Sequence, residues 1–215
     1  SEIVAATRRR VAEVKLAADL RQLERQAESH IPRDFQRRLK AISANGPAVI
    51  AELKRASPSR GVIRSDFDAA KLALELAGAG AAALSVLTDV EFFQGSLQNL
   101  QRASASTTLP CLRKDFIIDE FQLLEARAYG ADAVLLIVAA LSPTDLAILA
   151  RRAVEYKLDV LCEVHGEREL KLAVDAGCTL IGVNNRNLQT FQVDLKTAFQ
   201  LADSIPKSAF PVAES

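Results

Sequence analysis

The chain has 215 residues, of which 49% are apolar and 25% are charged, and its 27 Lys and Arg residues are balanced by 27 Asp and Glu residues. A net charge of zero leaves no excess of basic groups to neutralise phosphates, which argues against a nucleic-acid partner or an anionic membrane surface. No apolar run approaches the roughly 18 residues that a membrane span needs. The three cysteines form no CxxC pair, so we predict a cytoplasmic protein with reduced thiols.

The N-terminal segment differs from the rest of the chain. Apolar residues recur at helical spacing over 3–23 among charged residues, which predicts one amphipathic helix. A second helix is expected around Phe35 and Leu39, and the Asn-Gly-Pro sequence at 45–47 breaks the chain after it. We therefore predict that residues 1–47 form a helical extension that packs on the domain that follows.

Residues 48–215 change to short apolar runs separated by helical stretches. Continuous rather than alternating hydrophobicity predicts strands covered on both faces, as in a parallel sheet flanked by helices. Gly80, Gly130 and Gly177 each follow a predicted helix and precede an apolar run, and a left-handed conformation that ends the helix is expected there. Their spacing gives one strand-helix unit of about 24 residues. Seven strands are predicted, at 48–53, 81–87, 109–113, 132–138, 158–164, 179–184 and 209–213.

Polar or ionisable side chains stand at the C-terminal ends of five of these seven strands. Glu52 and Lys54 are two residues apart and therefore share one face of the first strand. An open doubly wound sheet gathers ligands at a single crevice, whereas a closed barrel brings every strand end to one mouth. The pattern therefore predicts an α/β fold, a (β/α)8 TIM barrel with an N-terminal helical extension. The remaining strand-end residues are Lys114, Glu163, Asn184 and Glu214.

Other candidates leave two interpretations open. The fourth strand offers only apolar side chains such as Leu135, and with Phe93 and Phe116 these residues either wall an aromatic substrate or pack in the core. The loop 57–61 is either a mobile flap near the substrate or a Pro/Ser/Gly turn. The two histidines are isolated, and the spacing around His165 matches no metal site, so no metal ligands are predicted.

Seven motifs follow one another at or near the strand ends: Ile50–Gly61, Leu84–Asp89 with Phe92–Gly95, Leu112–Phe116, Ala133–Ile137, Cys162–His165, Gly182–Leu188 and Glu214–Ser215. In this order, across the whole chain, they resemble the indole-3-glycerol phosphate synthase family. The resemblance implies an enzyme of tryptophan biosynthesis that closes 1-(2-carboxyphenylamino)-1-deoxyribulose 5-phosphate to an indole ring with loss of carbon dioxide and water. It implies no metal and no organic cofactor.

The resemblance also implies roles for individual residues. Lys114 corresponds to the general acid on the substrate carbonyl, and Glu163 to the general base of the later proton removal. Lys54 corresponds to a lysine that contacts the substrate carboxylate or phosphate and donates a proton in dehydration, and Glu52 to a group that positions the lysines. Whether burial lowers the lysine pKa values or nearby carboxylates raise them stays open. The predicted substrate-binding residues are Ser57, Phe93, Phe116, Leu135, Asn184, Arg186, Glu214 and Ser215.

The number of residues is too small for all eight units of the predicted barrel. After residue 47, units of about 24 residues accommodate seven strands, so we expect an eighth unit, with its phosphate-binding loop, to be missing from this chain. The alternative function is a truncated, non-catalytic barrel fragment completed by a partner or by missing residues. Another phosphate-sugar barrel, such as an isomerase, is disfavoured by the combination of Lys54, Lys114 and Glu163. Fusion to another tryptophan-pathway domain stays open.

Overall fold

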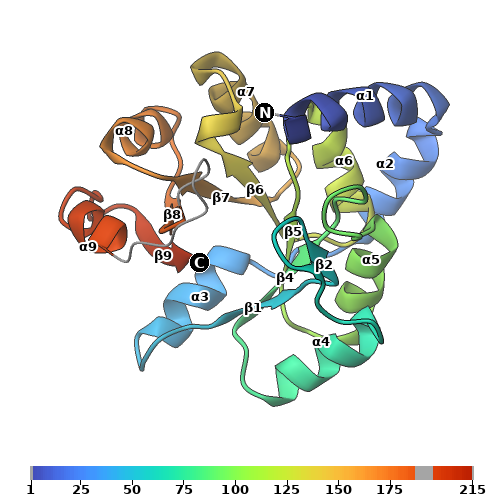
Figure 1. The fold of residues 1–215 in the computed structure, drawn as a ribbon, viewed down its shortest axis with the longest axis horizontal. Helices are drawn as coiled ribbons and strands as arrows, with labels where there is room; N and C mark the ends of the chain where they lie inside the picture. The colour runs from blue at the N-terminus through green and yellow to red at the C-terminus, as the bar shows by residue number, and fades with distance from the viewer. Residues whose placement is uncertain (1, 187–195, 215) are drawn as a thin grey trace.

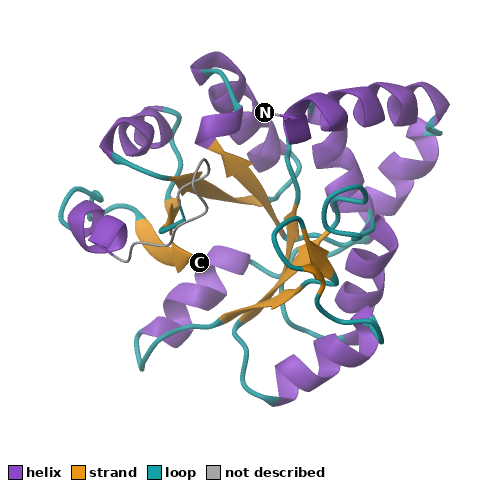
Figure 2. Cartoon of the chain, in the orientation of Figure 1, coloured by secondary structure: helices purple, strands orange, loops and turns teal. Residues whose placement is uncertain are grey.

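The structure is a computed structural model that describes residues 2–186 and 196–214. A curled parallel sheet lies inside a ring of helices (Figures 1 and 2). Its strands are hydrogen-bonded in the order in which they occur along the chain, as expected for repeated strand-helix units. The strands of this sheet are β1 (Ile50–Leu53), β4 (Ala83–Leu87), β5 (Cys111–Lys114), β6 (Ala133–Ile137), β7 (Asp159–Val164), β8 (Leu180–Asn184) and β9 (Phe210–Glu214).

Helices connect successive strands on the outer side of the sheet. Each of the helices α4 to α7 begins after an Asp or Ser residue. The side chain of that residue accepts a hydrogen bond from a backbone N–H group in the first turn of the helix. Gly80, Gly130 and Gly177 have φ angles of 92°, 85° and 81°, which confirms the predicted left-handed positions after α4, α6 and α8. The connecting helices are α4 (Ala69–Gly78), α5 (Leu97–Ser106), α6 (Glu120–Ala128), the 3-10 helix η1 (Val138–Ala140), α7 (Pro143–Glu155), α8 (Glu167–Asp175) and α9 (Lys196–Ala202).

The predicted elements agree with the structure except at two places. All seven predicted strands are present. The single helix expected over 3–23 is wrong, because the chain forms α1 (Glu2–Ala17) and α2 (Leu20–Ser29), and the Asp19 side chain caps α2 by accepting the N–H of Gln22. A small hairpin, β2 (Ala56–Ser57) and β3 (Gly61–Val62), was not predicted. A complete (β/α)8 barrel is not confirmed, since the described residues form a seven-stranded sheet with β1 and β9 at its edges.

An inner apolar layer fills the concave side of the sheet. The helix after the first two, α3 (Phe35–Ser43), places Phe35 and Leu39 against the strands, with 0% and 1% of their surface exposed. They pack with Ala83, Leu135 and Leu180, which come from three different strands. Burial of each large side chain stabilises the fold by about 2 to 3 kcal/mol. This layer closes the interior below the polar strand ends.

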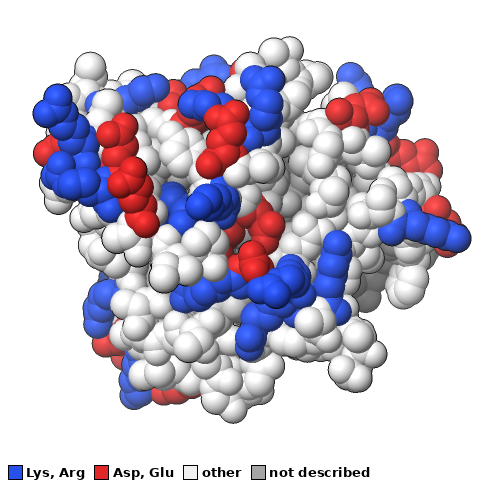
Figure 3. Space-filling model, turned by 180° about the vertical axis from the view of Figure 1, so that it is seen from behind, with Lys and Arg blue, Asp and Glu red and all other residues white. Residues whose placement is uncertain are grey.

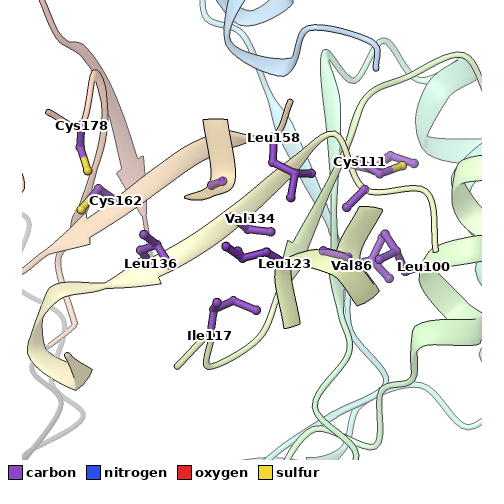
Figure 4. Packing of buried hydrophobic residues seen from close by; sticks show 14 of the residues in the cluster. Val86, Leu100, Cys111, Ile117, Leu123, Val134, Leu136, Leu158, Cys162 and Cys178 are labelled. Carbon is purple, nitrogen blue, oxygen red and sulfur yellow. The ribbon is translucent and has the colours of Figure 1, made fainter. Parts of the chain in front are cut away.

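An outer apolar layer joins the convex side of the sheet to the helices. Figure 4 shows Val134 and Leu136 of β6 beside Leu123 of α6, and Cys162 next to Cys178. The alternation of side chains along each strand therefore supplies both layers, as predicted from the continuous apolar runs.

The N-terminal segment is tied to the sheet by a buried carboxylate at the N-terminal end of β6. Asp132 accepts hydrogen bonds from His30 Nε2 at 3.0 Å, from Arg33 N and Nε at 2.9 Å each, and from Cys111 N at 2.7 Å. Burial would raise the pKa of Asp132, but the hydrogen bonds from His30 and Arg33 and the charge of Arg33 lower it below its ordinary value. The cluster therefore joins the segment before α3 to two neighbouring strands.

Charges of both signs share the outer surface. Figure 3 shows Lys and Arg side chains lying among Asp and Glu side chains over the face seen from behind, in keeping with their equal numbers in the sequence. Within residues 2–186 and 196–214, none of the helices combines the length and the apolar character that crossing a bilayer requires.

Candidate active site

Charged side chains from distant strands meet at the C-terminal end of the sheet. The Lys114 ammonium lies 3.0 Å from Oε2 of Glu214 and 3.5 Å from Oε2 of Glu52, and the other oxygen of Glu52 lies 2.5 Å from Lys54 Nζ. Glu52 and Glu214 belong to opposite edge strands. Because one lysine on β5 contacts both edges, the sheet curls enough to bring its strand ends to one mouth (Figure 1). We name Glu52, Lys54, Lys114, Glu163 and Glu214 the strand-end cluster.

The charge of Lys114 is set by the carboxylates around it. Burial alone would lower the pKa of this ammonium, but Glu214, Glu52 and Glu163 together raise it above its ordinary value. The same contacts act in the opposite sense on Glu52, where Lys114 and Lys54 outweigh burial and lower the pKa of the carboxyl group. For Lys114 the carboxylates therefore outweigh burial, and the side chain is an ammonium at neutral pH.

Glu163 has the most buried side chain of the cluster. Only 3% of its surface is exposed, and its partner in the strand register is Ile137, the last residue of β6. Burial raises the pKa of Glu163, and the nearby Glu214 carboxylate raises it further, whereas Lys114 and a hydrogen bond with Asn184 act against this. A carboxylate with a raised pKa is a stronger base and is suited to accept a proton.

A glycine makes room for this arrangement and was missed in the sequence analysis. A Cβ atom added to Gly182 of β8 would lie 2.2 Å from Oε1 of Glu214 and 3.2 Å from Leu161 Cδ1. Any larger residue would therefore displace the carboxylate that holds Lys114. The only sequence signal was a glycine inside a strand, which often marks a close approach of another group.

The remaining predicted site residues lie in three kinds of place. Phe93 and Phe116 are half-buried in the loops after β4 and β5, and Asn184 ends β8 and accepts the backbone N–H of Arg186 at 2.9 Å. Leu135 is 2% exposed in the inner apolar layer, and Ile137 is the residue that ends its strand. Ser215 lies outside the described residues.

Ser57 begins the turn of the β2–β3 hairpin, next to Lys54. Its carbonyl accepts the N–H of Arg60 at 3.3 Å, so the segment 57–61 adopts a turn, and its movement as a flap stays a prediction. A cavity of about 480 Å³ lies between the end of β1 and α4, with Glu52, Lys54, Ile63, Arg64, Leu72 and Leu76 among the residues that line it. In the described part of the chain, no three His, Cys, Asp or Glu side chains are grouped so that they could hold a metal ion.

His165 links Glu163 to the neighbouring helix. Its Nδ1 lies 3.1 Å from Oε2 of Glu169, and its Nε2 lies 3.4 Å from Oε1 of Glu163. Burial would lower the pKa of His165, but the hydrogen bond with Glu169 and the charges of Glu163 and Glu169 raise it above its ordinary value.

Replacing His165 by Asn is expected to destabilise the fold more at low pH than at high pH. A raised folded pKa means that the imidazolium stabilises the fold fully below the unfolded pKa of about 6.5, and that this contribution is lost as pH rises through the folded pKa. Urea unfolding at about pH 5.5 and about pH 8.5 measures the difference. Lys171→Met on α8, the helix that carries Glu169, breaks an exposed pair with Asp175 and is the control. An equal loss at both pH values would contradict the prediction.

Comparison with solved structures finds similar folds at low sequence identity. KGPDC from Streptococcus mutans has a TM-score of 0.58 and 12% identity, over 79% of this chain and 77% of that chain. The 2-keto-3-deoxy-6-phosphogluconate aldolase of Zymomonas mobilis ZM4, solved with 3-phosphoglycerate, has a TM-score of 0.54 and 15% identity, over 78% of this chain and 69% of that chain. At these identities the similarity shows the fold alone.

Comparison of sequences is more specific. The family model described as indole-3-glycerol phosphate synthase matches residues 1–215. A relative of that name from Koribacter versatilis (strain Ellin345) is 58% identical over 209 residues, which are 97% of this chain and 80% of that protein. Another from Polaromonas naphthalenivorans (strain CJ2) is 46% identical over 217 residues, covering 100% of this chain and 82% of that protein. The chain therefore belongs to the indole-3-glycerol phosphate synthase family.

Proposed function

We propose that this chain catalyses the closure of 1-(2-carboxyphenylamino)-1-deoxyribulose 5-phosphate to indole-3-glycerol phosphate, as a carbon–carbon lyase of the carboxy-lyase type in tryptophan biosynthesis. The observation that carries the proposal is the Lys114 ammonium held between Glu52 and Glu214 in one mouth with the buried Glu163. The proposal also places the reaction in the cytoplasm, and the free thiols of the three buried cysteines support a reducing compartment.

The first chemical step uses Lys114 as the general acid. The ring carbon that bears the carboxylate attacks the substrate carbonyl carbon, a carbon–carbon bond forms, and the carbonyl oxygen takes the proton of the Lys114 ammonium. Loss of carbon dioxide from the same ring carbon then returns its electron pair to the ring. Its raised pKa keeps Lys114 in the ammonium form, and the Glu214 and Glu52 carboxylates, at 3.0 Å and 3.5 Å, hold the ammonium in place for the transfer.

The second step removes water. Glu163 accepts the proton that must leave the intermediate, and Lys54 donates a proton to the departing hydroxyl group, so that a double bond forms and water is released. Glu52 contacts both lysines and orients them without itself changing bonds. Burial of Glu163 supports its part, because a carboxylate with a raised pKa retains a proton more readily.

Substrate binding is proposed at the rim of the same mouth. Phe93 and Phe116 lie in the loops after β4 and β5 and flank the aromatic ring, with Leu135 in the apolar layer beneath. The hydroxyl, carboxylate and phosphate groups of the substrate are proposed to contact Ser57, Asn184, Arg186, Glu214 and Ser215.

Replacing Glu163 by Gln tests the proposed function. The amide cannot accept the proton of the second step, so we expect kcat to fall by about 10²- to 10⁴-fold. Formation of indole-3-glycerol phosphate is followed by its fluorescence. Glu167→Gln, which changes an exposed carboxylate on the helix that follows the same strand, is expected to leave kcat within about twofold of the original. Equal turnover of the two variants would refute the role of Glu163.

The alternative function, a non-catalytic fragment completed by a partner or by further residues, has one observation in its favour. In the described residues, β1 pairs with β4 and β9 pairs with β8, so each presents an outer edge to which another strand can add. A folded chain that shows no turnover would favour this alternative. Turnover restored by adding an eighth strand-helix unit from a relative would then identify what completes the site.

A further inference from the structure

One arginine of the N-terminal segment reaches the same end of the sheet as the strand-end cluster. Arg10 of α1 places Nη1 3.3 Å from Oδ2 of Asp89 and Nη2 3.2 Å from Oδ1 of Asp115. The two aspartate side chains are 3% and 1% exposed, whereas that of Arg10 is 27% exposed. Two carboxylates removed from water need a positive charge close by, and a helix distant in sequence provides it.

Each of the two carboxylates also holds the backbone of an aromatic residue. Oδ1 of Asp89 accepts the N–H of Phe92 at 2.7 Å and that of Phe93 at 3.2 Å. Oδ1 of Asp115 accepts the N–H of Phe116 at 2.9 Å. Arg10 therefore connects, through one carboxylate on each side, the two loops that carry the aromatic residues of the proposed substrate site.

The two sides of this connection are not equally well anchored. Oδ2 of Asp115 accepts hydrogen bonds from Thr88 Oγ1 at 2.7 Å and from Arg113 Nη2 at 3.0 Å, and both bonds are buried. The positive charge that pairs with Asp89 is that of Arg10 on α1. The pKa of Asp89 is raised by burial and by the like charge of Asp115. Without Arg10, the two carboxylates would repel each other, and the loop after Asp89 is the part expected to shift.

We propose that Arg10 is a positioning residue that fixes the separation of Phe93 and Phe116, in the loops after β4 and β5, at the mouth of the sheet. The function of the two aromatic residues in this statement rests on the proposed function. The connection itself rests on the contacts of Arg10, Asp89 and Asp115 and can be tested without any turnover.

The same N-terminal segment contains a matched control. Arg33 also connects the segment to the sheet, but it pairs with Asp132 at the N-terminal end of β6, the end opposite to the strand-end cluster. In barrels of this kind, that end contributes to stability and the C-terminal end to catalysis. Lys15, which is on α1 with Arg10 and pairs with the half-buried Asp119, controls for the loss of a positive charge from this helix.

Amide hydrogen exchange tests the connection in the folded protein. In Arg10→Met, we expect peptides containing Phe92, Phe93 and Phe116 to exchange about tenfold faster. Lys15→Met should leave them unchanged, and Arg33→Met should affect peptides around Asp132 instead. Unchanged exchange at the aromatic residues in Arg10→Met would overturn the proposal, whether or not the chain is active.

Steady-state kinetics test its consequence for the reaction. We expect kcat of Arg10→Met to fall by about 10- to 100-fold with a smaller change in KM, because a displaced reaction geometry affects the transition state more than binding. Arg10→Lys should recover part of kcat, since one ammonium can contact one carboxylate at a time. Arg33→Met should keep its kcat while losing stability. An equal fall of kcat in both variants would overturn the proposal, whereas absence of turnover in the unaltered chain would count against the proposed function alone.

Discussion

Replacing Lys114 by alanine is expected to lower kcat for indole-3-glycerol phosphate formation by about 10³-fold, which lies within the range for loss of a general acid. The substitution removes the ammonium that lies 3.0 Å from Glu214 and 3.5 Å from Glu52. The carbonyl oxygen would then have to take its proton from water as the ring closes. The three carboxylates near this position would also lose the positive charge that separates them, so binding of an anionic substrate should weaken as well.

The measurement is the rise of indole fluorescence at saturating substrate, with circular dichroism to confirm the fold. Lys71→Ala is the matched control, because it removes an exposed lysine from the helix that follows the first strand, where it pairs only loosely with Glu75 at 3.9 Å. Near-normal kcat in Lys114→Ala would refute the general-acid role. A loss of fold in Lys114→Ala would instead assign the residue to stability, and Lys114→Met, which keeps the side-chain volume, then separates the two effects.

Replacing Asp132 by asparagine is expected to lower the free energy of unfolding by about 3 to 5 kcal/mol, the usual cost of breaking a buried ion pair from one side. The side chain of Asp132 is 0% exposed and accepts hydrogen bonds from His30, Arg33 and Cys111. An amide group carries no charge and offers one acceptor oxygen in place of two. The guanidinium of Arg33 would therefore stay partly buried without its partner.

The loss of stability caused by Asp132→Asn should be larger at neutral pH than at low pH. Because the folded pKa of Asp132 is lowered, its contribution is present above the unfolded value of about 3.9 and is lost as pH falls through the folded pKa. Urea unfolding at neutral pH and at about pH 3 measures this. Asp175→Asn, which breaks an exposed pair with Lys171, should change stability by less than about 0.5 kcal/mol. A kcat reduced in the folded Asp132→Asn variant would contradict a purely stabilising role.

Local patterns along the chain predicted most of the secondary structure. Unbroken apolar runs marked all seven strands, because a strand buried on both faces needs apolar side chains on both. The break of the first helix at Asp19 was missed, since one capping side chain decides it within a continuous helical pattern. The β2–β3 hairpin was missed because its strands of two residues each carry too little periodicity to detect.

The candidate site likewise has features that the sequence predicts and features that only the structure shows. Which residues stand at the strand ends, among them Lys54, Lys114 and Glu163, followed from the sequence, because strand alternation and chain order depend only on neighbouring residues. The tertiary structure alone decided that Lys114 lies between the two edge strands and that its pKa is raised rather than lowered. It alone also showed that Arg10 joins two distant loops. Charges act through space, so their balance follows from distances that the linear order of residues does not contain.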